Sequence, residues 1–333
     1  MRVARLHGAG DLRLNDEPDP VPGPGEELVE VSSVGLCGSD RHWFLEGAIG
    51  ETALTRPLVL GHEIAGVVVS GRRRGERVAV EPADPCGRCA TCRAGLGHLC
   101  PTTRFAGHGT TDGGLRTLMA WPGQLLVPIP DAVGPDDAAL LEPLGVALHA
   151  MDLAKVERAT SASVVGCGPI GLLLIQALAA GGCERIAAVE LLGHRREAAL
   201  AAGATTASAS WPADEALVDV AFEAAGEDDA VGVAVESVRP GGRVVLVGIP
   251  GGDATSFPAS TARRKGLTIL LSRRMAAGDL ERAVALSSAG KVRPGRIVTA
   301  RHPLEQVDAA FGSLVGRDGL KIVVVRQAGS SAT

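Results

Sequence analysis

Tyrosine is absent from this 333-residue chain, lysine occurs only four times, and aromatic residues make up 2% of the sequence. Without tyrosine the chain cannot use a tyrosine general acid, which excludes enzymes such as short-chain dehydrogenases with a Tyr–Lys pair. The 33 basic and 38 acidic residues give a formal charge of −5, which argues against a nucleic-acid or anionic-membrane surface. Because 46% of the residues are hydrophobic, a disordered chain is excluded, and the length predicts about two domains.

Targeting and membrane signals are weak or missing. The first residues include Arg2, Arg5 and Asp11 with no apolar run between them, so we expect no secretory signal and a cytoplasmic protein. Residues 159–183 carry no charged side chain and are long enough to span a membrane. Glycine and proline interrupt this stretch near its start, however, so it predicts a strand, a turn and a buried helix instead of a membrane segment.

The pattern of apolar residues changes near residue 143. Residues 1–142 predict short strands bounded by proline, glycine and charged residues, whereas strands and helices alternate after them. This alternation predicts strands over 161–166, 185–190, 219–226, 243–250 and 267–274, and helices over 169–182, 194–204 and 230–242. We therefore expect an α/β protein, with a β-rich domain of residues 1–142 and 273–333 and a doubly wound parallel-sheet domain of residues 143–272.

Four of the seven cysteines share one loop-like segment with the spacing C-x2-C-x2-C-x7-C. They are Cys86, Cys89, Cys92 and Cys100. Four soft thiolates suit a tetrahedral zinc ion, and a closed four-thiolate site leaves no position for substrate, so we expect a structural zinc lobe over residues 84–102. Two disulfides are disfavoured in a cytosolic chain, and an iron–sulfur cluster remains a second alternative.

A glycine-rich motif follows the strand predicted over residues 161–166. Gly166, Gly168 and Gly171 give G-x-G-x-x-G, and an apolar helix begins at Pro169 and Ile170. Glycines at these positions allow a tight turn, the approach of a pyrophosphate and close packing of helix on strand. Because strand and helix flank the motif as a dinucleotide requires, we favour a cofactor site over a plain βα turn.

Other residues of the α/β domain complete this predicted cofactor site. Glu190 closes the next strand, where a carboxylate can accept both ribose hydroxyls of NAD and would repel the 2′-phosphate of NADP. Arg195 and Arg196 leave NADP open, since a nearby arginine can accommodate that phosphate. Val247 and Ile249 end a later strand, where we expect their backbone atoms to lie within reach of the nicotinamide amide.

A second group of metal-binding residue types lies in the first half of the chain. Cys37 occurs in GLCGSDRHW, His62 and Glu63 occur in VLGHEIAG, and Glu142 opens EPLGVALHA. A thiolate, an imidazole and one or two carboxylates can form a zinc site that keeps one position open. Each residue alone is a weak signal, because a lone cysteine is more often part of a core.

Together these motifs resemble those of zinc-dependent medium-chain alcohol dehydrogenases, with most similarity to the sorbitol (polyol) and threonine dehydrogenase branches. The similar motifs GLCGSD, GHEIAG, the four-cysteine lobe, DGG, EPL and VVGCGPIG lie within residues 26–326. The resemblance implies a GroES-like catalytic domain and a Rossmann domain, a catalytic and a structural zinc ion in each chain, and an NAD cofactor. It also implies a small alcohol substrate and a homodimer or homotetramer associated through the strand LTILLSRR.

The resemblance also implies roles for single residues. Cys37 and His62 would be catalytic zinc ligands, Glu63 would complete them in polyol-type members, and Glu142 would contact the zinc water and exchange with Glu63. Ser39 and His42 would form the catalytic proton relay, unless His42 is a plain surface histidine, and Asp40 would orient His62. Substrate contacts would come from Trp43, Phe105 and Arg273, although the two aromatic rings could equally be core and Arg273, with Arg274, could be solvated.

The implied reaction is the oxidation of a secondary alcohol, such as a polyol, sugar or cyclitol, to a ketone by hydride transfer to the nicotinamide. Zinc would act as a Lewis acid that stabilises the alkoxide. A threonine or simple-alcohol dehydrogenase is the main alternative, and a non-catalytic dinucleotide-binding protein is a second one. Lys321 opens the strand KIVVV and is expected to be no more than its flank.

Overall fold

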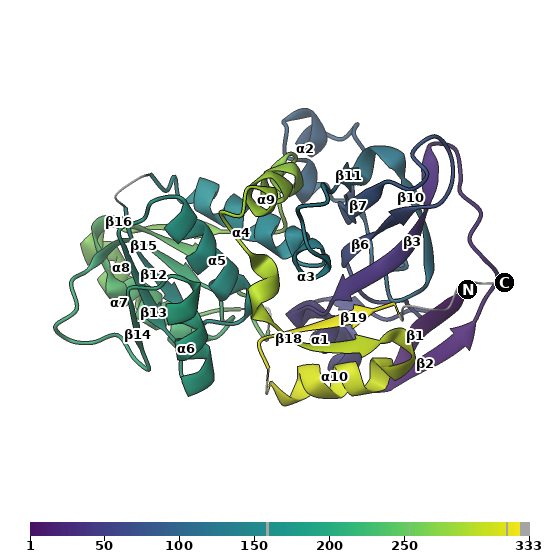
Figure 1. Cartoon of the computed structure of the whole chain (residues 1–333). Helices are drawn as coiled ribbons and strands as arrows, with labels where there is room; N and C mark the ends of the chain where they lie inside the picture. The colour runs from purple at the N-terminus through teal and green to yellow at the C-terminus, as the bar shows by residue number, and fades with distance from the viewer. Residues whose placement is uncertain (158–159, 253, 318, 327–333) are drawn as a thin grey trace. The chain divides into compact units, whose positions relative to one another are not determined.

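The computed structural model describes residues 1–157, 160–252, 254–317 and 319–326. The chain folds into two units, one formed by Met1–Glu142 with Leu280–Thr333 and the other by Pro143–Asp279. Figure 1 shows the first unit beginning with purple strands and ending with yellow ones, because the chain returns to it after completing the second unit.

The first unit is built on a seven-stranded sheet with the order β11-β7-β6-β3-β19-β18, in which β10 also pairs with β3. The strands are β3 (Glu26–Gly35), β6 (Glu63–Val68), β7 (Arg77–Val80), β10 (Leu118–Pro122), β11 (Leu126–Pro128), β18 (Val298–Pro303) and β19 (Lys321–Val325). The last strand, β19, pairs antiparallel with β3, so Figure 1 shows a yellow strand beside a purple one. This pairing joins the end of the chain to the sheet formed by its first part.

Smaller elements surround this sheet. The paired strands are β1 (Arg2–Gly8) with β2 (Asp11–Asp16), β4 (Ala48–Ile49) with β5 (Thr52–Ala53), and β8 (Ala83–Asp84) with β9 (Arg104–Phe105). The α-helices are α1 (Gly38–Glu46), α2 (Ala90–Arg93), α3 (Pro135–Ala138) and α10 (Val307–Gly316), with α9 (Asp279–Ser288) beginning at the boundary of the units. Short 3-10 helices cover Gly97–Leu99, Gly123–Leu125, Pro294–Ile297 and Leu304–Gln306. Apolar side chains from β3, β6, α1 and α10 share one buried core.

The second unit is a six-stranded parallel sheet with the order β14-β13-β12-β15-β16-β17. Its strands are β12 (Ser161–Val165), β13 (Arg185–Val189), β14 (Thr206–Ser208), β15 (Val218–Glu223), β16 (Val238–Leu246) and β17 (Thr268–Leu271). Its helices are α4 (Leu141–Leu153, which begins just before the boundary), α5 (Pro169–Ala180), α6 (Gly193–Ala202), α7 (Asp228–Ser237) and α8 (Ala259–Lys265). In Figure 1, α5 and α6 cover one face of the sheet and α7 and α8 the other.

The parallel sheet explains why its strands are almost continuously apolar. Strands covered by helices on both faces have no solvent side, so side chains of both orientations are buried. Val164, Phe222 and Val244, from three neighbouring strands, are fully buried. The expected α/β class with a doubly wound sheet is confirmed.

Two boundaries differ from those that the sequence suggested. Residues 273–279 stay with the second unit, because Met275 lies against Gly145 and Asp279 pairs with His149 at 3.7 Å. The helix expected over 230–242 ends at Ser237, and Val238–Leu246 forms β16, which includes Pro240 and Gly241.

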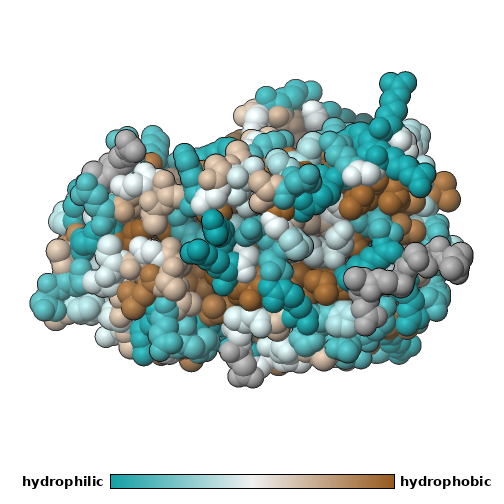
Figure 2. Space-filling view, in the orientation of Figure 1, coloured by the Kyte–Doolittle hydropathy of each residue, from teal (hydrophilic) through white to brown (hydrophobic). Residues whose placement is uncertain are grey.

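The uncharged stretch of residues 159–183 contains the strand β12 and the twelve-residue helix α5. Among the described residues, no helix combines the length and the apolar character needed to cross a membrane. Figure 2 shows a face on which hydrophilic residues alternate with separate apolar patches. The most exposed large apolar side chains are Val21, Leu191 and Leu271.

Candidate functional site

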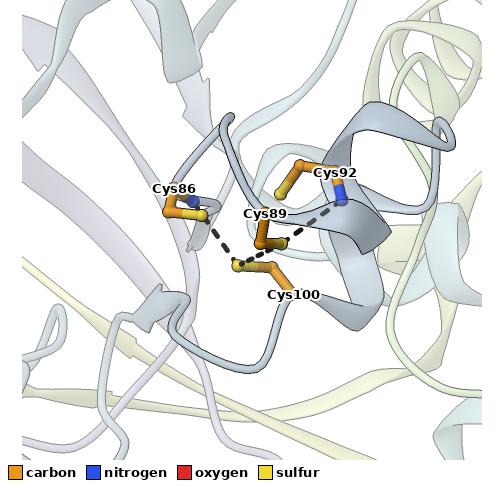
Figure 3. A group of neighbouring side chains, drawn as sticks. All are labelled: Cys86, Cys89, Cys92 and Cys100. Atoms are coloured by element: carbon orange, nitrogen blue, oxygen red, sulfur yellow. Dashed lines mark hydrogen bonds between the residues drawn. The ribbon is translucent and has the colours of Figure 1, made fainter.

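The four loop cysteines converge on one point in the first unit, as Figure 3 shows. The ligand atoms of Cys86, Cys89, Cys92 and Cys100 all lie within 4.8 Å of one another. Cys89 precedes the short helix α2, and its sulfur accepts a hydrogen bond from the Cys92 N–H at 3.4 Å. The Cys100 sulfur accepts one from the Cys86 N–H at 3.5 Å. Backbone N–H groups thus aim at the sulfurs, as suits thiolates.

The spacing of these sulfurs fits a single tetrahedral ion. The Sγ atoms of Cys89 and Cys100 are 3.9 Å apart, and none of the four cysteines forms a disulfide. Zinc–sulfur bonds of about 2.3 Å place two sulfurs of a tetrahedron about 3.8 Å apart. The four sulfurs therefore enclose a space that fits one metal ion. This space is too small for an iron–sulfur cluster.

The thiols of this lobe do not ionise equally without a cation. The Arg88 backbone N–H, with Thr102 and the Cys89 N–H, lowers the pKa of Cys86 to about 6. Burial, with hydrogen bonds to Cys89 and Cys100, raises the pKa of Cys92 to about 12. One thiolate therefore forms readily while its neighbour resists ionisation, and a bound cation would remove that conflict.

The second cluster contains Cys37, His62 and Glu63, whose ligand atoms also lie within 4.8 Å of one another. Cys37 is the residue before α1, and Glu63 opens β6, where it pairs with Gly35 of β3. The register of two neighbouring strands therefore brings the thiol to the His-Glu pair. His62 and Glu63 are buried, and Cys37 is partly exposed.

Lys321 is a buried cation that holds Glu63. Its Nζ lies 2.6 Å from each carboxylate oxygen of Glu63 and donates to the Leu36 carbonyl oxygen at 2.8 Å. The lysine side chain is 1% exposed. Burial lowers the pKa of Lys321, but Glu63 and Cys37 outweigh this and raise it, so the ammonium stays charged. A residue that the sequence suggested was only a strand flank is therefore part of this site.

Asp40 supports the other two members of the cluster. It is fully buried in α1 and accepts hydrogen bonds from the Cys37 N–H at 2.9 Å and the Gly61 N–H at 3.2 Å. Its carboxylate lies 3.8 Å from Nδ1 of His62. Asp40 thus joins the backbone of Cys37 to that of Gly61, the residue before His62. This is expected of a carboxylate that orients a metal-bound imidazole.

Glu142 is buried beside this cluster but is not one of its three close ligands. Burial, opposed by His62 and supported by Glu63, raises the pKa of Glu142 to about 7. Of the two carboxylates that the sequence left open, Glu63 is the one grouped with Cys37 and His62 in this structure.

The surroundings of the cluster carry an excess of negative groups. Asp40, Glu63 and Glu142 are buried beside the partly exposed Cys37, and the described cations among them are Lys321 and protonated His62. Burial disfavours the charged imidazole, but Asp40, Cys37 and Glu142 raise the pKa of His62 to about 10. A divalent cation would offset this excess, and thiolate, imidazole and carboxylate are zinc ligands.

The two residues expected to move the proton both lie on α1. Ser39 is partly exposed, two positions after Cys37. His42 is 22% exposed, and its Nδ1 lies 2.7 Å from a carboxylate oxygen of Glu46, one helical turn further on. The helix therefore carries both groups next to a ligand, with His42 already in contact with a surface carboxylate.

The residues expected to contact substrate lie in different surroundings. The Phe105 ring is partly exposed, with its centroid 5.4 Å from that of His62. Trp43 is 1% exposed within the core of the first unit, where His108 packs edge-on against its ring at 5.4 Å. Arg273 is exposed in the second unit. Phe105 thus lies beside His62, a proposed metal ligand, whereas the Trp43 ring is part of the hydrophobic core.

The three glycines of the second unit occupy positions that demand glycine for different reasons. Gly166 has φ +91°, and a Cβ there would lie 2.8 Å from the Ala225 backbone nitrogen. At Gly171 a Cβ would lie 2.0 Å from the Gly166 carbonyl oxygen. Gly168 precedes Pro169 at the start of α5, and a Cβ there would meet only Arg195, at 3.8 Å. The turn is therefore tight at both ends and open in the middle, as an approaching pyrophosphate requires.

Glu190 lies beside this turn. Its carboxylate accepts hydrogen bonds from the Cys167 N–H at 2.8 Å and the Leu192 N–H at 3.0 Å. Arg196 donates to the carbonyl oxygens of Glu190 and Leu191, so its guanidinium is already engaged. Arg195 points toward Gly168, and its buried Nε has no hydrogen-bond partner within the described residues.

Val247 and Ile249 follow β16 at the carboxyl edge of the sheet. The Val247 N–H donates to the Glu223 carbonyl oxygen at 2.8 Å, and the Ile249 side chain is 48% exposed. No sequence motif assigned a role to Glu223, a buried carboxylate at the end of β15. Its signal in the sequence was a lone acidic residue at the end of an apolar strand.

The chain matches known families over most of its length. Residues 23–131 match the alcohol dehydrogenase GroES-like domain, and residues 169–289 match the zinc-binding dehydrogenase family. A probable D-xylulose reductase A of Aspergillus fumigatus is 34% identical over 342 residues, which cover 96% of this chain and 95% of the relative.

Solved structures show the same fold. The 2R,3R-butanediol dehydrogenase of Bacillus subtilis has a TM-score of 0.87 and 29% identity, with 98% of this chain and 99% of that chain covered. The rspB alcohol dehydrogenase of Escherichia coli CFT073, solved with NADH, has a TM-score of 0.89 and 26% identity, with the same coverage of 98% and 99%.

These matches confirm the expected family, enzyme class and fold, with a structural four-cysteine cluster and a catalytic Cys-His-Glu cluster. The D-xylulose reductase exceeds 30% identity over nearly the whole chain. One family match falls within the first unit, and the other covers most of the second unit and continues into residues 280–289 of the first. The chain therefore belongs to the family of zinc-dependent medium-chain alcohol dehydrogenases.

Proposed function

We propose that this enzyme oxidises a secondary alcohol of the polyol, sugar or cyclitol class to the ketone, with NAD as hydride acceptor. The observation that carries the proposal is the cluster of Cys37, His62 and Glu63, whose ligand atoms lie within 4.8 Å of one another. Three protein ligands leave a fourth zinc position open for a substrate oxygen. Similarity to a D-xylulose reductase supports a polyol substrate.

Cys37, His62 and Glu63 would hold the catalytic zinc, and Cys86, Cys89, Cys92 and Cys100 the structural one. When bound, the catalytic ion supplies Lewis-acid stabilisation of negative charge on the substrate oxygen. In the proposed relay, Ser39 would accept the proton of the substrate hydroxyl as it releases its own hydroxyl proton, and His42 would pass that proton to solvent. Imidazole suits this work because it titrates near neutral pH.

Glu142 gives the site a polar side and Phe105 gives it an apolar side. Glu142 is a buried carboxyl beside the proposed zinc ligands, and burial raises its pKa. Phe105 adds an apolar ring beside His62. We propose that Glu142 contacts a polar group of the substrate or the water at the metal, and that Phe105 limits access of bulk water. Arg273 is proposed as a further contact to a hydroxyl-rich or anionic substrate.

NAD is proposed over NADP because Glu190 places a carboxylate beside the glycine turn. A 2′-phosphate would meet that negative charge, and Arg196 is already bonded to backbone carbonyls. Arg195 is the remaining cation that could favour NADP, since its guanidinium points toward Gly168. Glu190→Ala should therefore weaken NAD binding much more than NADP binding, and an equal loss for both cofactors would contradict the ribose role of Glu190.

The reaction is tested by NADH absorbance with zinc-loaded protein, NAD and a panel of polyols, cyclitols, threonine and simple alcohols. Reduction of NAD by a polyol or cyclitol supports the proposal. Reduction only by threonine or a simple alcohol would keep the mechanism and overturn the substrate class. A protein that binds zinc but no NAD would revive the alternative of a non-catalytic relative.

We also propose a homodimer or homotetramer that associates through β17. This strand is the last of the parallel sheet, and its other edge has no partner strand among the described residues. Leu271 on β17 is 76% exposed, and an apolar edge strand is a template for pairing. Light scattering should give a multiple of the 33.9 kDa chain mass. A monomeric mass would contradict this proposal.

A further inference from the structure

Glu223 is a buried carboxylate that the proposed chemistry does not use. It ends β15, between β12 and β16 in the middle of the parallel sheet, and it is 1% exposed. Removing a carboxylate from water is costly unless hydrogen bonds replace the lost hydration. Its partners therefore show what the side chain holds in place.

The partners of Glu223 are backbone groups of two turns. Oε1 accepts hydrogen bonds from the N–H groups of Ala225 and Gly226, each at 2.6 Å. The Glu223 carbonyl oxygen accepts from Val247 at 2.8 Å and from Gly248 at 3.1 Å. Burial raises the pKa of Glu223 above its usual value, while the N–H groups of Gly226, Ala225 and Gly248 oppose the shift. One residue thus connects the turn after β15 with the segment after β16.

These two turns meet without side chains between them. Gly226 has φ +77°, and a Cβ there would lie 2.2 Å from the Ile249 carbonyl oxygen. At Gly248 a Cβ would lie 2.2 Å from the Gly226 nitrogen and 2.9 Å from Oε2 of Glu223. The Glu223 carboxylate is the side-chain group at this contact: it accepts from the N–H groups of Ala225 and Gly226 and lies against Gly248, whereas the bonds to Val247 and Gly248 come from the Glu223 main-chain carbonyl.

The glycine-rich turn of the cofactor site packs on the same place. A Cβ at Gly166 would lie 2.8 Å from the Ala225 nitrogen, and the Ala224 N–H donates to the Val165 carbonyl oxygen at 2.8 Å. Three turns at the carboxyl edge of the sheet therefore converge around Glu223. This edge is where open parallel sheets bind their ligands.

We propose that Glu223 is a positioning residue for the nicotinamide half of the cofactor: its carboxylate fixes the turn of Ala225 and Gly226, on which the backbone of residues 247–249 packs. The inference rests on the proposed function, in which Val247 and Ile249 contact the nicotinamide amide. In the proposed function the adenosine ribose is held by Glu190, which makes no hydrogen bond to Glu223. Loss of the Glu223 carboxylate should therefore weaken binding of the nicotinamide half selectively.

Glu223→Gln tests this role with little change in size. The glutamine side chain has an NH2 group in place of one carboxylate oxygen. It therefore loses one hydrogen-bond acceptor and places a donor close to backbone N–H groups, which are also donors. The matched control is Asp219→Asn, the same chemical change at the other end of the same strand, where Asp219 accepts from Ser161 and Arg239. Glu223→Asp is the second variant: it keeps the charge but shortens the side chain, in case the glutamine variant does not fold.

The measurement compares NADH with ADP-ribose, which lacks the nicotinamide. In Glu223→Gln we expect the dissociation constant of NADH to rise about tenfold, as for loss of hydrogen bonds to a charged group, and that of ADP-ribose to stay nearly unchanged. Glu223→Asp should show a smaller rise, and Asp219→Asn should change neither constant. Equal weakening of both ligands, or no weakening of NADH, would overturn the inference.

Hydrogen exchange gives a readout that needs no cofactor. The amides of Ala225 and Gly226, which donate to the carboxylate, and of Gly248, which lies against it, should exchange faster in Glu223→Gln than in the wild type, and not in Asp219→Asn. Unchanged exchange at these amides would overturn the positioning role. Failure of the wild type to bind NADH would instead contradict the proposed function, so the two failures are distinguishable.

Discussion

The two metal-ligand clusters of the first unit are built in opposite ways. The four-thiol cluster uses residues of one short segment, from Cys86 to Cys100, and three of its four cysteines are partly exposed. The other cluster joins Cys37 to His62 and Glu63, and buried charged groups surround it. The first is therefore a local motif, whereas the second exists only after the sheet has formed.

This difference separates stability from chemistry. Four thiolates complete a tetrahedron, so a zinc ion there can only stabilise its lobe. Three ligands leave a position for substrate, and the nearby Glu142 and Lys321 can change the charge balance that the ion experiences. We therefore expect substitutions at the two clusters to affect different measured quantities.

The largest effect is expected at the three-ligand cluster. Cys37→Ala should lower turnover by about a thousandfold or more, because a Lewis acid contributes several kcal/mol to the reaction. Zinc content should fall from two ions per chain to one, with little change in melting temperature. Metal analysis measures the zinc content, and the rate of NADH formation measures the turnover. Full activity with one zinc per chain would contradict the assignment of this cluster.

The opposite result is expected at the four-thiol cluster. Cys92→Ser should also remove one zinc ion, but it should lower the free energy of unfolding by about 4 kcal/mol, as loss of a structural metal does. The molecules that stay folded should keep nearly wild-type turnover. Thermal unfolding and turnover per folded chain measure this, and loss of turnover without loss of stability would reverse our interpretation of the two clusters.

A third variant tests the buried charges that only one cluster has. Lys321→Met leaves Glu63 buried without its cation, so the metal-free protein should lose about 3 kcal/mol of unfolding free energy. The zinc-loaded protein should lose less, because the metal replaces the ammonium as partner of Glu63. Adding Glu63→Gln should recover part of the loss in the metal-free form. An equal loss with and without zinc would show that Lys321 acts independently of the metal.

The same contrast explains what the sequence could predict. The cysteine lobe and the glycine turn are local, so the spacing of their residues predicted both, and the strand–helix alternation predicted the doubly wound sheet. Lys321 and Glu63 are 258 positions apart, and only the pairing of β19 with β3 places them together. No pattern near Lys321 marks it as more than the start of a strand.

Burial of single aromatic rings was equally hard to predict. Trp43 lies on α1 close to Ser39 and His42, so the motif suggested a place near substrate, but its ring is in the core. A nine-residue helix with mixed residues gives no clear apolar face from which its orientation could be read. Phe105 lies on the two-residue strand β9, and only the fold brings its ring to His62.

The smallest effect is expected for Asp219→Asn, which changes a carboxylate far in sequence from both clusters. This variant therefore serves as a control for the others. Hydrogen bonds from Ser161, opposed by burial and supported by Arg239, lower the pKa of Asp219 to about 2. Its stabilising contribution is therefore fully present above the unfolded pKa near 3.9 and is lost as the pH falls through about 2. Because the ion pair with Arg239 is partly exposed, Asp219→Asn should cost only about 1 kcal/mol at neutral pH.

This cost should appear without any loss of zinc or of turnover. Denaturant unfolding at pH 7 and at pH 2 measures it, and the difference between variant and wild type should shrink at the lower pH as Asp219 itself becomes protonated. If Asp219→Asn also released zinc, then a moderate loss of stability alone would empty a metal site. The stability loss of Cys92→Ser could then no longer be assigned to the four-thiol cluster itself.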